Sequence, residues 1–179
     1  MITLKKKSGV LGEKYLQHFV VGEEHVYLLK IDEGVMMSTH QTETMTNQDF
    51  INQAYGDVLV FGLGLGMILF PLLDDKDIKS ITVIEMDHGV IDMVGKVVKT
   101  HDKDNKLTII PGDAFTYHEN LKNKRFDTIY FDIWIKIDEK AYAEMETLHD
   151  LYRKFMKSAA SYMHSWCYEM KDEYFSRKV

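Results

Sequence analysis

The sequence predicts an α/β fold in which a doubly wound parallel sheet of about five strands follows an N-terminal antiparallel β-ribbon. Short apolar, β-branched runs alternate with helix-like stretches after residue 55, which is the pattern of parallel strands with crossover helices. A glycine-rich turn follows the first of these runs. Before residue 40, turn residues separate the apolar runs instead. We therefore expect a ribbon over residues 1–40 and a sheet domain over residues 41–179, packed as one structural unit.

The N-terminal ribbon is predicted from three apolar runs, Phe19–Val21, Val26–Ile31 and Val35–Met37. Glycine and acidic residues at positions 22–24 and 32–34 separate these runs, and this composition is typical of hairpin turns. On the residues alone, the ribbon is a simple cover for an edge of the sheet.

A polar stretch over residues 38–47 leads into a helix expected over Gln48–Tyr55. Thr46 or Asn47 would be its N-cap, because a side-chain oxygen at that position can accept from a free backbone N–H of the first turn.

The first strand of the sheet is expected at Val58–Phe61, four apolar residues in a row that suit a strand buried on both faces. Gly62, Gly64 and Gly66 follow it and leave no Cβ atoms where the chain turns into a helix. Such a turn lets backbone N–H groups and the positive end of a helix dipole approach a ligand. Met67 stands where a dinucleotide fingerprint needs its third glycine, so the pattern is Gly-x-Gly-x-Gly.

Three further strands each lead to an acidic residue. Glu85 ends the run Ile81–Ile84 and lies 23 positions after Gly62, Asp113 follows Leu107–Ile110, and Asp132 follows Thr128–Phe131. An acid about 20 positions after the glycine turn is placed to accept hydrogen bonds from two ribose hydroxyls. The sequence therefore predicts a nucleoside site at the ends of the strands.

The helices between these strands are predicted from their apolar stripes. Residues 67–73 are almost all apolar, and Pro71 requires that helix to be short or kinked. The helix His88–Lys99 carries a stripe at i, i+1, i+4, i+7 and i+8, with Lys96 and Lys99 on its solvated face. The stripe consists of Val90, Ile91, Val94, Val97 and Val98.

The C-terminal part is expected to hold a helix over Glu139–Lys157, a strand near Ala160–Cys167 and a closing helix to about Arg177. The apolar stripe of the first helix comprises Ala141, Met145, Leu148, Tyr152, Phe155 and Ala159. Too few residues follow Cys167 for two more strands and a helix, so the sheet should stop at five.

The runs GDVLVFGLGLG, VIEMD, PGDA and FDTIYFDIW resemble, in their order and spacing, the class I S-adenosylmethionine-dependent methyltransferases. Within that family they are most similar to the branch that includes the spermidine synthases. The resemblance covers about residues 18–135. It implies a Rossmann-like fold with S-adenosyl-L-methionine as the cofactor, and an N-terminal ribbon that mediates dimer contacts and borders the active site.

The resemblance also implies roles for single residues in this site. Glu85 would hold the ribose, Met86 would flank the adenine, and Asp113 and Ala114 would lie at its amino group. The remaining cofactor-binding residues, at the methionine end, would be Gly62, Gly64 and Gly66.

Residues that contact the substrate are implied in the same way. The position of the stretch 38–47 in the family puts it over the cofactor, so His40, Gln41 and Glu43 are candidates for lid or substrate contacts. A solvated loop would explain them equally well. Asp132 would orient the acceptor as the catalytic residue, or it only caps the strand end. Trp134 is either a wall of the substrate site or part of the core.

The chain departs from the family at three positions. Val60 stands where many methyltransferases carry an acid, although the spermidine synthase branch also lacks that acid. Leu65 stands where the branch has the aspartate of its glycine loop. Ile135 stands where aminopropyltransferases have a second aspartate, which binds and deprotonates a polyamine amine.

Bulk composition limits the function classes. The net charge of −6 gives no general attraction to nucleic acid or to an anionic membrane, so a small-molecule substrate is favoured. A single cysteine, Cys167, and the lack of a targeting segment predict a cytoplasmic protein. No histidine or cysteine spacing suits a metal site or a hydrolase triad. An uncovered sheet edge predicts a homodimer or larger homo-oligomer.

Three function classes are consistent with this sequence. An S-adenosylmethionine-dependent methyltransferase of unknown substrate is favoured, because one orienting acid suffices for methyl transfer. The alternatives are an aminopropyltransferase, or another enzyme that uses an S-adenosyl nucleotide, and a binding or assembly protein that keeps the fold without turnover. Because Ile135 removes the second acid, the sequence predicts no aminopropyl transfer to putrescine.

Overall fold

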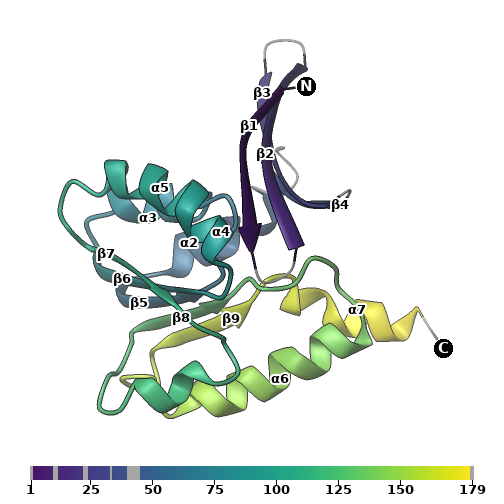
Figure 1. Cartoon of the computed structure of the whole chain (residues 1–179). Helices are drawn as coiled ribbons and strands as arrows, with labels where there is room; N and C mark the ends of the chain where they lie inside the picture. Colours follow the sequence, from purple (N-terminus) through teal and green to yellow (C-terminus); the bar gives the residue numbers. More distant parts are fainter. Residues whose placement is uncertain (1, 10–11, 22–23, 33, 40–44, 178–179) are drawn as a thin grey trace.

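The computed structural model describes residues 2–9, 12–21, 24–32, 34–39 and 45–177. They form two sheets, a four-stranded antiparallel sheet and a five-stranded parallel sheet. Figure 1 shows the antiparallel sheet rising from the α/β body that holds the parallel sheet. The fold class predicted from the sequence is confirmed.

The antiparallel sheet runs in the order β1-β2-β3-β4. Its strands are β1 (Ile2–Gly9), β2 (Gly12–Val21), β3 (Glu24–Ile31) and β4 (Gly34–Ser38). The sequence predicted only three strands here and began the first at Phe19. It missed β1 and the first half of β2, since three consecutive lysines and a polar run hide the strand pattern.

The parallel sheet has the strand order β7-β6-β5-β8-β9. Its strands are β5 (Gly56–Phe61), β6 (Ile78–Glu85), β7 (Leu107–Pro111), β8 (Thr128–Phe131) and β9 (Tyr162–Ser165). The prediction of a sheet with five parallel strands is confirmed. The order reverses between β5 and β8, and the carboxyl edge at such a reversal is where open α/β sheets bind ligands.

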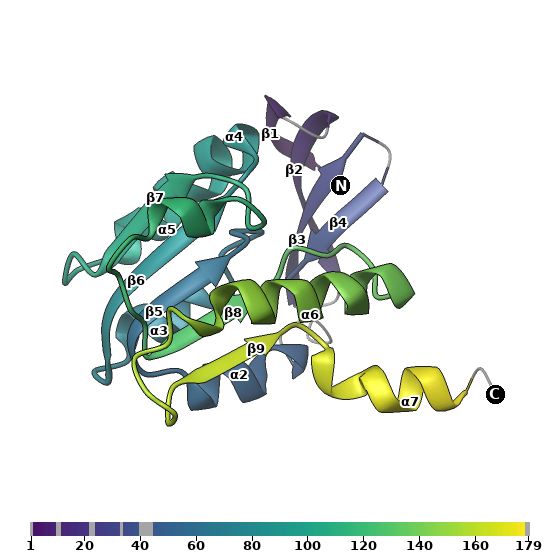
Figure 2. The same cartoon turned by 90° about the horizontal axis from the view of Figure 1, so that it is seen from below.

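Helices cover both faces of this sheet, and Figure 1 shows α3, α4 and α5 above it and α6 beneath it. Their bounds are α2 (Gln48–Gln53), α3 (Leu69–Asp74), α4 (His88–Val90), α5 (Lys96–His101), α6 (Glu139–Arg153) and α7 (Lys171–Ser176). Three further turns are η1 (Ile91–Gly95), η2 (Tyr117–Asn120) and η3 (Tyr168–Met170). Figure 2 shows the same arrangement from below, with α6 in front of β8.

The two faces of the sheet bury separate hydrophobic clusters. On one face, Val58, Val60 and Ile81 pack with residues of α2, α3, α4 and α5. On the other face, Leu59 and Phe131 pack with residues of α6. Because alternate residues of β5 enter opposite clusters, the run over residues 58–61 is buried throughout, as predicted.

The helix predicted over His88–Lys99 is interrupted by η1, which is a π-helical turn. Such a turn adds a residue to the helical repeat and rotates the side chains that follow it. Val90, Val94 and Val98 are buried as predicted, whereas Val97 is 42% exposed. The predicted core position of Val97 is therefore wrong, because the stripe was drawn for an uninterrupted α-helix.

Two smaller predictions are also corrected. Asn47 is the residue before α2, but its side chain makes no capping hydrogen bond. Its Oδ1 atom instead accepts from the Tyr130 hydroxyl at 2.6 Å, which joins α2 to β8. Ala159 is exposed because α6 already ends at Arg153.

Candidate active site

The carboxyl edge of the parallel sheet gathers the predicted site. Phe61 pairs with Ile84 on one side and with Phe131 on the other, so the turn after β5 lies between the ends of β6 and β8. Glu85 pairs with Pro111, which brings the end of β7 to the same edge. The glycine turn and the acids at 85, 113 and 132 therefore share one edge, as the sequence predicted.

The glycine turn depends on backbone conformations that side chains rarely adopt. Gly62, Gly64 and Gly66 all have positive φ, at 97°, 49° and 74°. A Cβ atom on Gly62 would lie 2.1 Å from the carbonyl oxygen of Asp132, so the turn packs directly on the chain after β8. On Gly66 it would lie 2.5 Å from Val98, so this glycine allows the helix to approach closely.

Glu85 is the buried acid of the site, with 5% of its surface exposed. Its Oε2 atom accepts from the backbone N–H of Leu63 in the glycine turn, and its Oε1 atom accepts from the backbone N–H of Asp87, both at 2.8 Å. Burial raises the pKa of this carboxyl, and the two N–H donors oppose that rise. Each oxygen keeps a further lone pair that a ribose hydroxyl could use.

The residues predicted to surround the adenine differ in exposure. Met86 is 41% exposed at the end of β6, so its apolar side chain is available to a flat ring. Asp113 is exposed, and its Oδ1 atom accepts from the backbone N–H of Phe115 at 2.8 Å. Ala114 is buried, and its carbonyl oxygen accepts from Tyr152 on α6. The contacts of all three with a nucleoside stay predictions.

The loop after β8 places one side chain at the site and another against α6. Asp132 is half-buried, and its backbone N–H donates to Phe61, which fixes it beside the glycine turn. Trp134 donates its indole N–H to Glu144 at 2.9 Å and packs against residues of α6. This contact favours the packing role for Trp134, and its contact with a substrate stays a prediction.

The lid candidates His40, Gln41 and Glu43 lie outside the described residues. Met37, at the end of β4, is a site residue that the sequence analysis missed. Its sulfur accepts from the backbone N–H of Leu65 at 3.1 Å and lies 2.5 Å from a Cβ placed on Gly64. The antiparallel sheet therefore contacts the glycine turn, which favours its role beside the site over a simple edge cover.

Glu169, in η3 after β9, was also missed. The carboxylates of Glu169 and Asp132 both act on the Cys167 thiol, whose pKa is raised to about 12 by burial first and then by these charges. Burial and the same two carboxylates raise the pKa of Tyr130. Glu169 follows β9, and β9 is the neighbour of β8 in the parallel sheet. No sequence motif marked this residue.

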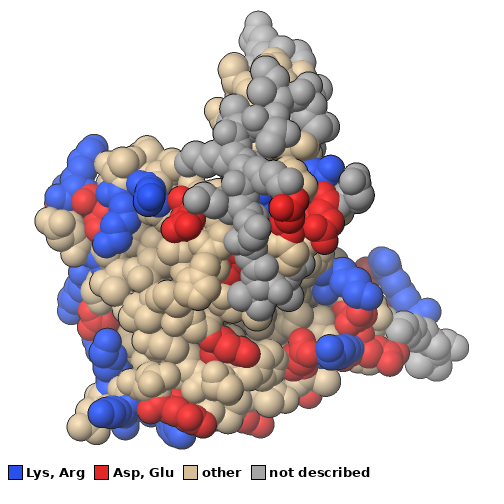
Figure 3. Space-filling model, in the orientation of Figure 1, with Lys and Arg blue, Asp and Glu red and all other residues tan. Residues whose placement is uncertain are grey.

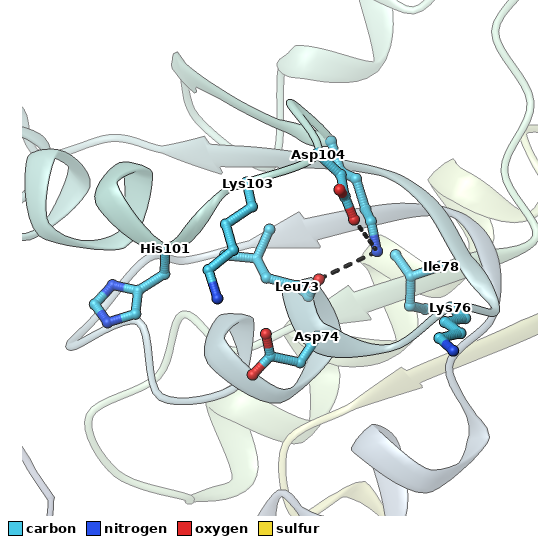
Figure 4. Close-up of a pocket in the computed structure, with 8 residues that line it drawn as sticks. Leu73, Asp74, Lys76, Ile78, His101, Lys103 and Asp104 are labelled. Atoms are coloured by element: carbon cyan, nitrogen blue, oxygen red, sulfur yellow. Dashed lines mark hydrogen bonds and ion pairs between the residues drawn. The ribbon is translucent and has the colours of Figure 1, made fainter.

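Two hollows lie away from this edge. One, of about 330 Å³, is lined by residues 73–78 and 101–106, which precede β6 and β7 at the opposite edge. The Lys106 side chain lines this hollow, where its Nζ atom lies 3.7 Å from Asp104 and donates to the Leu73 carbonyl oxygen. Figure 4 shows Leu73 and Asp104 among the residues around it. A second, of about 400 Å³, is lined by residues of η2 and by Phe155.

Charge and hydropathy add three observations. In Figure 3, positive and negative side chains alternate around the visible face and uncharged residues fill its centre. Among the described residues, no three histidine, cysteine or acidic side chains are grouped so that they could hold a metal ion. In the same part of the chain, every helix is too short or too polar to cross a membrane.

Comparison with known proteins identifies relatives. Residues 24–165 match the sequence model of the family described as "Spermine/spermidine synthase domain". The polyamine aminopropyltransferase of Hydrogenobaculum sp. (strain Y04AAS1) is 26% identical over an alignment of 152 residues that covers 79% of this chain and 53% of that protein. The polyamine aminopropyltransferase of Buchnera aphidicola subsp. Schizaphis graminum (strain Sg) is 27% identical over an alignment of 141 residues that covers 73% of this chain and 47% of that protein. The chain thus spans about half the length of these curated relatives.

Solved structures share the fold. The crystal structure of spermidine synthase from Thermotoga maritima superposes with a TM-score of 0.63 at 19% identity, covering 87% of this chain and 54% of that chain. A spermidine synthase in complex with the transition-state analogue AdoDATO gives a TM-score of 0.62 at 18% identity, covering 87% and 53%.

Proposed function

The chain belongs to the spermine/spermidine synthase family, and from this premise we propose that it transfers the aminopropyl group of decarboxylated S-adenosylmethionine to an amine. The observation that carries the proposal is the family match, which spans the glycine turn and all the acids at the ends of β6, β7 and β8. The curated relatives are polyamine aminopropyltransferases. This reverses the preference for methyl transfer that the sequence motifs gave.

The donor would bind through its nucleoside. Glu85 is held by two backbone N–H groups and offers its remaining lone pairs to the ribose hydroxyls. Met86 would cover one face of the adenine, since its side chain is exposed beside Glu85. The sulfonium would then lie toward Gly62 and Asp132, which pack on each other.

The reaction is a substitution at carbon. The amine nitrogen attacks the aminopropyl carbon bonded to the sulfonium, and the new N–C bond forms as the C–S bond breaks. The sulfur keeps the electron pair and leaves as 5′-methylthioadenosine. The attacking amine must lose a proton first, and in the proposal the carboxylate of Asp132 accepts it.

The acceptor is a cation at neutral pH, so the reaction favours two acids near the attacking nitrogen. Ile135 does not supply one, and its side chain is 51% exposed. Glu169 is the replacement that we propose, because it lies in η3 just after β9, and β9 is the neighbour of β8, the strand that leads to Asp132. It bonds to His164 at 2.9 Å, so binding of an ammonium group would compete with that contact.

Methyl transfer is the second candidate. The apolar residue at position 135 favours it, because methyl transfer depends on alignment rather than on a second acid. In that reaction S-adenosylmethionine is the donor and S-adenosylhomocysteine is the nucleoside product.

The proposal is tested by incubating the chain with decarboxylated S-adenosylmethionine and putrescine and detecting spermidine by mass spectrometry. We expect turnover in the wild type, a loss of at least about 100-fold in kcat for Asp132→Asn, and a rise in KM for putrescine for Glu169→Gln. Asp172→Asn is the control, since Asp172 is an exposed acid of α7.

Absence of spermidine with putrescine, and of any aminopropylated product with longer diamines or spermidine as acceptors, would contradict aminopropyl transfer. Formation of S-adenosylhomocysteine from S-adenosylmethionine in the presence of a cell extract would then support the second candidate. Unchanged kinetics in Asp132→Asn would remove Asp132 from the mechanism.

A further inference from the structure

A buried lysine connects the antiparallel sheet to the nucleoside side of the site. Lys14 belongs to β2, and its side chain has no exposed surface. Its Nζ atom lies 3.0 Å from Oδ2 of Asp87, which is 1% exposed, and donates to the carbonyl oxygen of Gly12 at 3.2 Å. An ion pair without solvent contact on either side is uncommon, because removing both charges from water costs several kcal/mol per ion.

The partner of this lysine is tied directly to the ribose-binding acid. The backbone N–H of Asp87 donates to Oε1 of Glu85 at 2.8 Å. Oδ1 of Asp87 accepts from the backbone N–H of Val90 at 3.1 Å, which caps α4. A displacement of Asp87 would therefore move both a hydrogen bond of Glu85 and the start of the following helix.

Lys14 is also linked to Glu85 through charge. Glu85 and Asp87 are both buried, and the charge of Asp87 adds to burial in raising the pKa of Glu85. Two buried carboxylates this close disfavour each other's ionised form, and a nearby cation relieves that cost. Lys14 supplies that cation, and it comes from a different sheet. His88, the next residue along α4, is exposed and faces solvent.

We propose that Lys14 is a positioning residue for the donor nucleoside: it neutralises Asp87, holds the turn between β6 and α4, and so keeps Glu85 ionised to accept the ribose hydroxyls. The inference rests on the proposed function, because it concerns the same nucleoside site. It also gives the antiparallel sheet a role in donor binding through β2.

The test is the affinity for 5′-methylthioadenosine, measured by calorimetry between pH 6 and pH 8.5. We expect Lys14→Met to bind at least about tenfold more weakly than the wild type at pH 7, since it leaves Asp87 as an uncompensated buried charge. Lys14→Arg, which keeps the charge, should recover most of the affinity. Lys30→Met, on the neighbouring strand β3, is the matched control and should bind as the wild type does.

The pH profile separates this role from a purely structural one. In Lys14→Met, the pH at which affinity falls by half should rise by at least about one unit, because Glu85 then takes up a proton more readily. The double variant Lys14→Met with Asp87→Asn removes the repelling charge and keeps a capping side chain. Its profile should return toward that of the wild type.

Three results would overturn the inference. If Lys14→Met folds and binds with the wild-type affinity and pH profile, Lys14 does not position the site. If neither the single nor the double variant folds, the ion pair belongs to folding rather than to binding. If the wild type itself does not bind 5′-methylthioadenosine, the proposed function fails, and this inference fails with it.

Discussion

His149 shows how burial, as the main cause, sets the charge state of a side chain in this protein. It lies on α6, its Nε2 atom is 2.8 Å from the Ser165 hydroxyl oxygen, and its ring packs 4.8 Å from the ring of Tyr168. Burial first, and then the charge interactions with His164 and Arg153, lowers the pKa of His149 to about 4. The neutral imidazole is therefore part of the folded state.

Acid should destabilise the protein through this residue. The folded pKa of about 4 lies below the unfolded value of about 6.5, so the unfolded chain binds more protons between these two values. The contribution is fully present above about pH 6.5 and is lost as the pH falls toward 4. Because the ring is partly exposed, we expect a loss of no more than about 3 kcal/mol.

Urea unfolding of the wild type and of His149→Gln between pH 7 and pH 4 measures this effect. The variant should lose less stability on acidification than the wild type, and His101→Gln, at an exposed histidine, should behave as the wild type does. Equal pH slopes in the wild type and in His149→Gln would show that the histidine titrates alike in both states.

The location of a site residue could be predicted from the sequence where that residue stands at the end of a strand. Glu85 follows an apolar run, so its place at the carboxyl edge was predictable. The role of Asn47 was not predictable. In the sequence it has the position and type of a helix N-cap, but its side chain accepts a hydrogen bond from Tyr130, which is distant in the chain and adjacent in space. Glu169 and Lys14 were missed for the same reason.

Among the elements, the turn Gly62–Gly66 makes contacts with most of the other parts of the site. It contacts Glu85 through Leu63, Asp132 through Gly62, and Met37 through Leu65. Three strand ends and the antiparallel sheet therefore meet at five residues. Any change of backbone conformation here should affect folding and binding together.

Gly62→Ala tests that statement. The residue has a φ of 97°, and the added Cβ would lie 2.1 Å from the Asp132 carbonyl oxygen. We expect a loss of at least about 2 kcal/mol in the free energy of unfolding. Gly34→Ala is the matched control, because its Cβ would lie 3.5 Å from its nearest neighbour. A Gly62→Ala variant as stable as the control would show that the turn adopts another conformation in solution.

Element prediction succeeded where the hydrophobic period was regular and failed where it was not. The strands β5 to β8 and the helix α6 follow their apolar patterns. The strand β1 does not, because its charged residues gain their structure from pairing with β2. The π-helical turn η1 could not be predicted, since nothing in the local sequence marks the extra residue in the repeat.

At the scale of the whole molecule, two sheets leave their edge strands open within the described residues. The strands β1 and β4 end the antiparallel sheet, and β7 and β9 end the parallel one. Val20 and Val35 of the antiparallel sheet are each 52% exposed. Unpaired edges and exposed apolar side chains favour association with a second copy.

The oligomeric state is predicted on this basis. Light scattering at micromolar concentration should give at least twice the chain mass of 20.9 kDa. A mass of 20.9 kDa over the same range would contradict the prediction, and the exposed valines would then need another explanation.

The sequence predicted the five parallel strands of the sheet, because each strand and crossover helix repeats one local pattern. It could not predict how the antiparallel sheet joins that body. Two contacts join the sheet to this body: Lys14 with Asp87, and Met37 with Leu65. Residues of these types occur in many other environments, so the sequence did not indicate that they would meet. The preference for methyl transfer rested on the apolar residue at position 135, whereas the family match over residues 24–165 favours the alternative of aminopropyl transfer.

The identity of the nucleoside formed from decarboxylated S-adenosylmethionine tests the proposed aminopropyl transfer most directly, because it shows which bond to sulfur breaks. The chain is incubated with this donor and an amine, and the nucleosides are separated and identified by mass spectrometry. Aminopropyl transfer predicts 5′-methylthioadenosine in equal amount to the aminopropylated amine. Decarboxylated S-adenosylhomocysteine would show that the methyl group had left instead, and would contradict the proposed function.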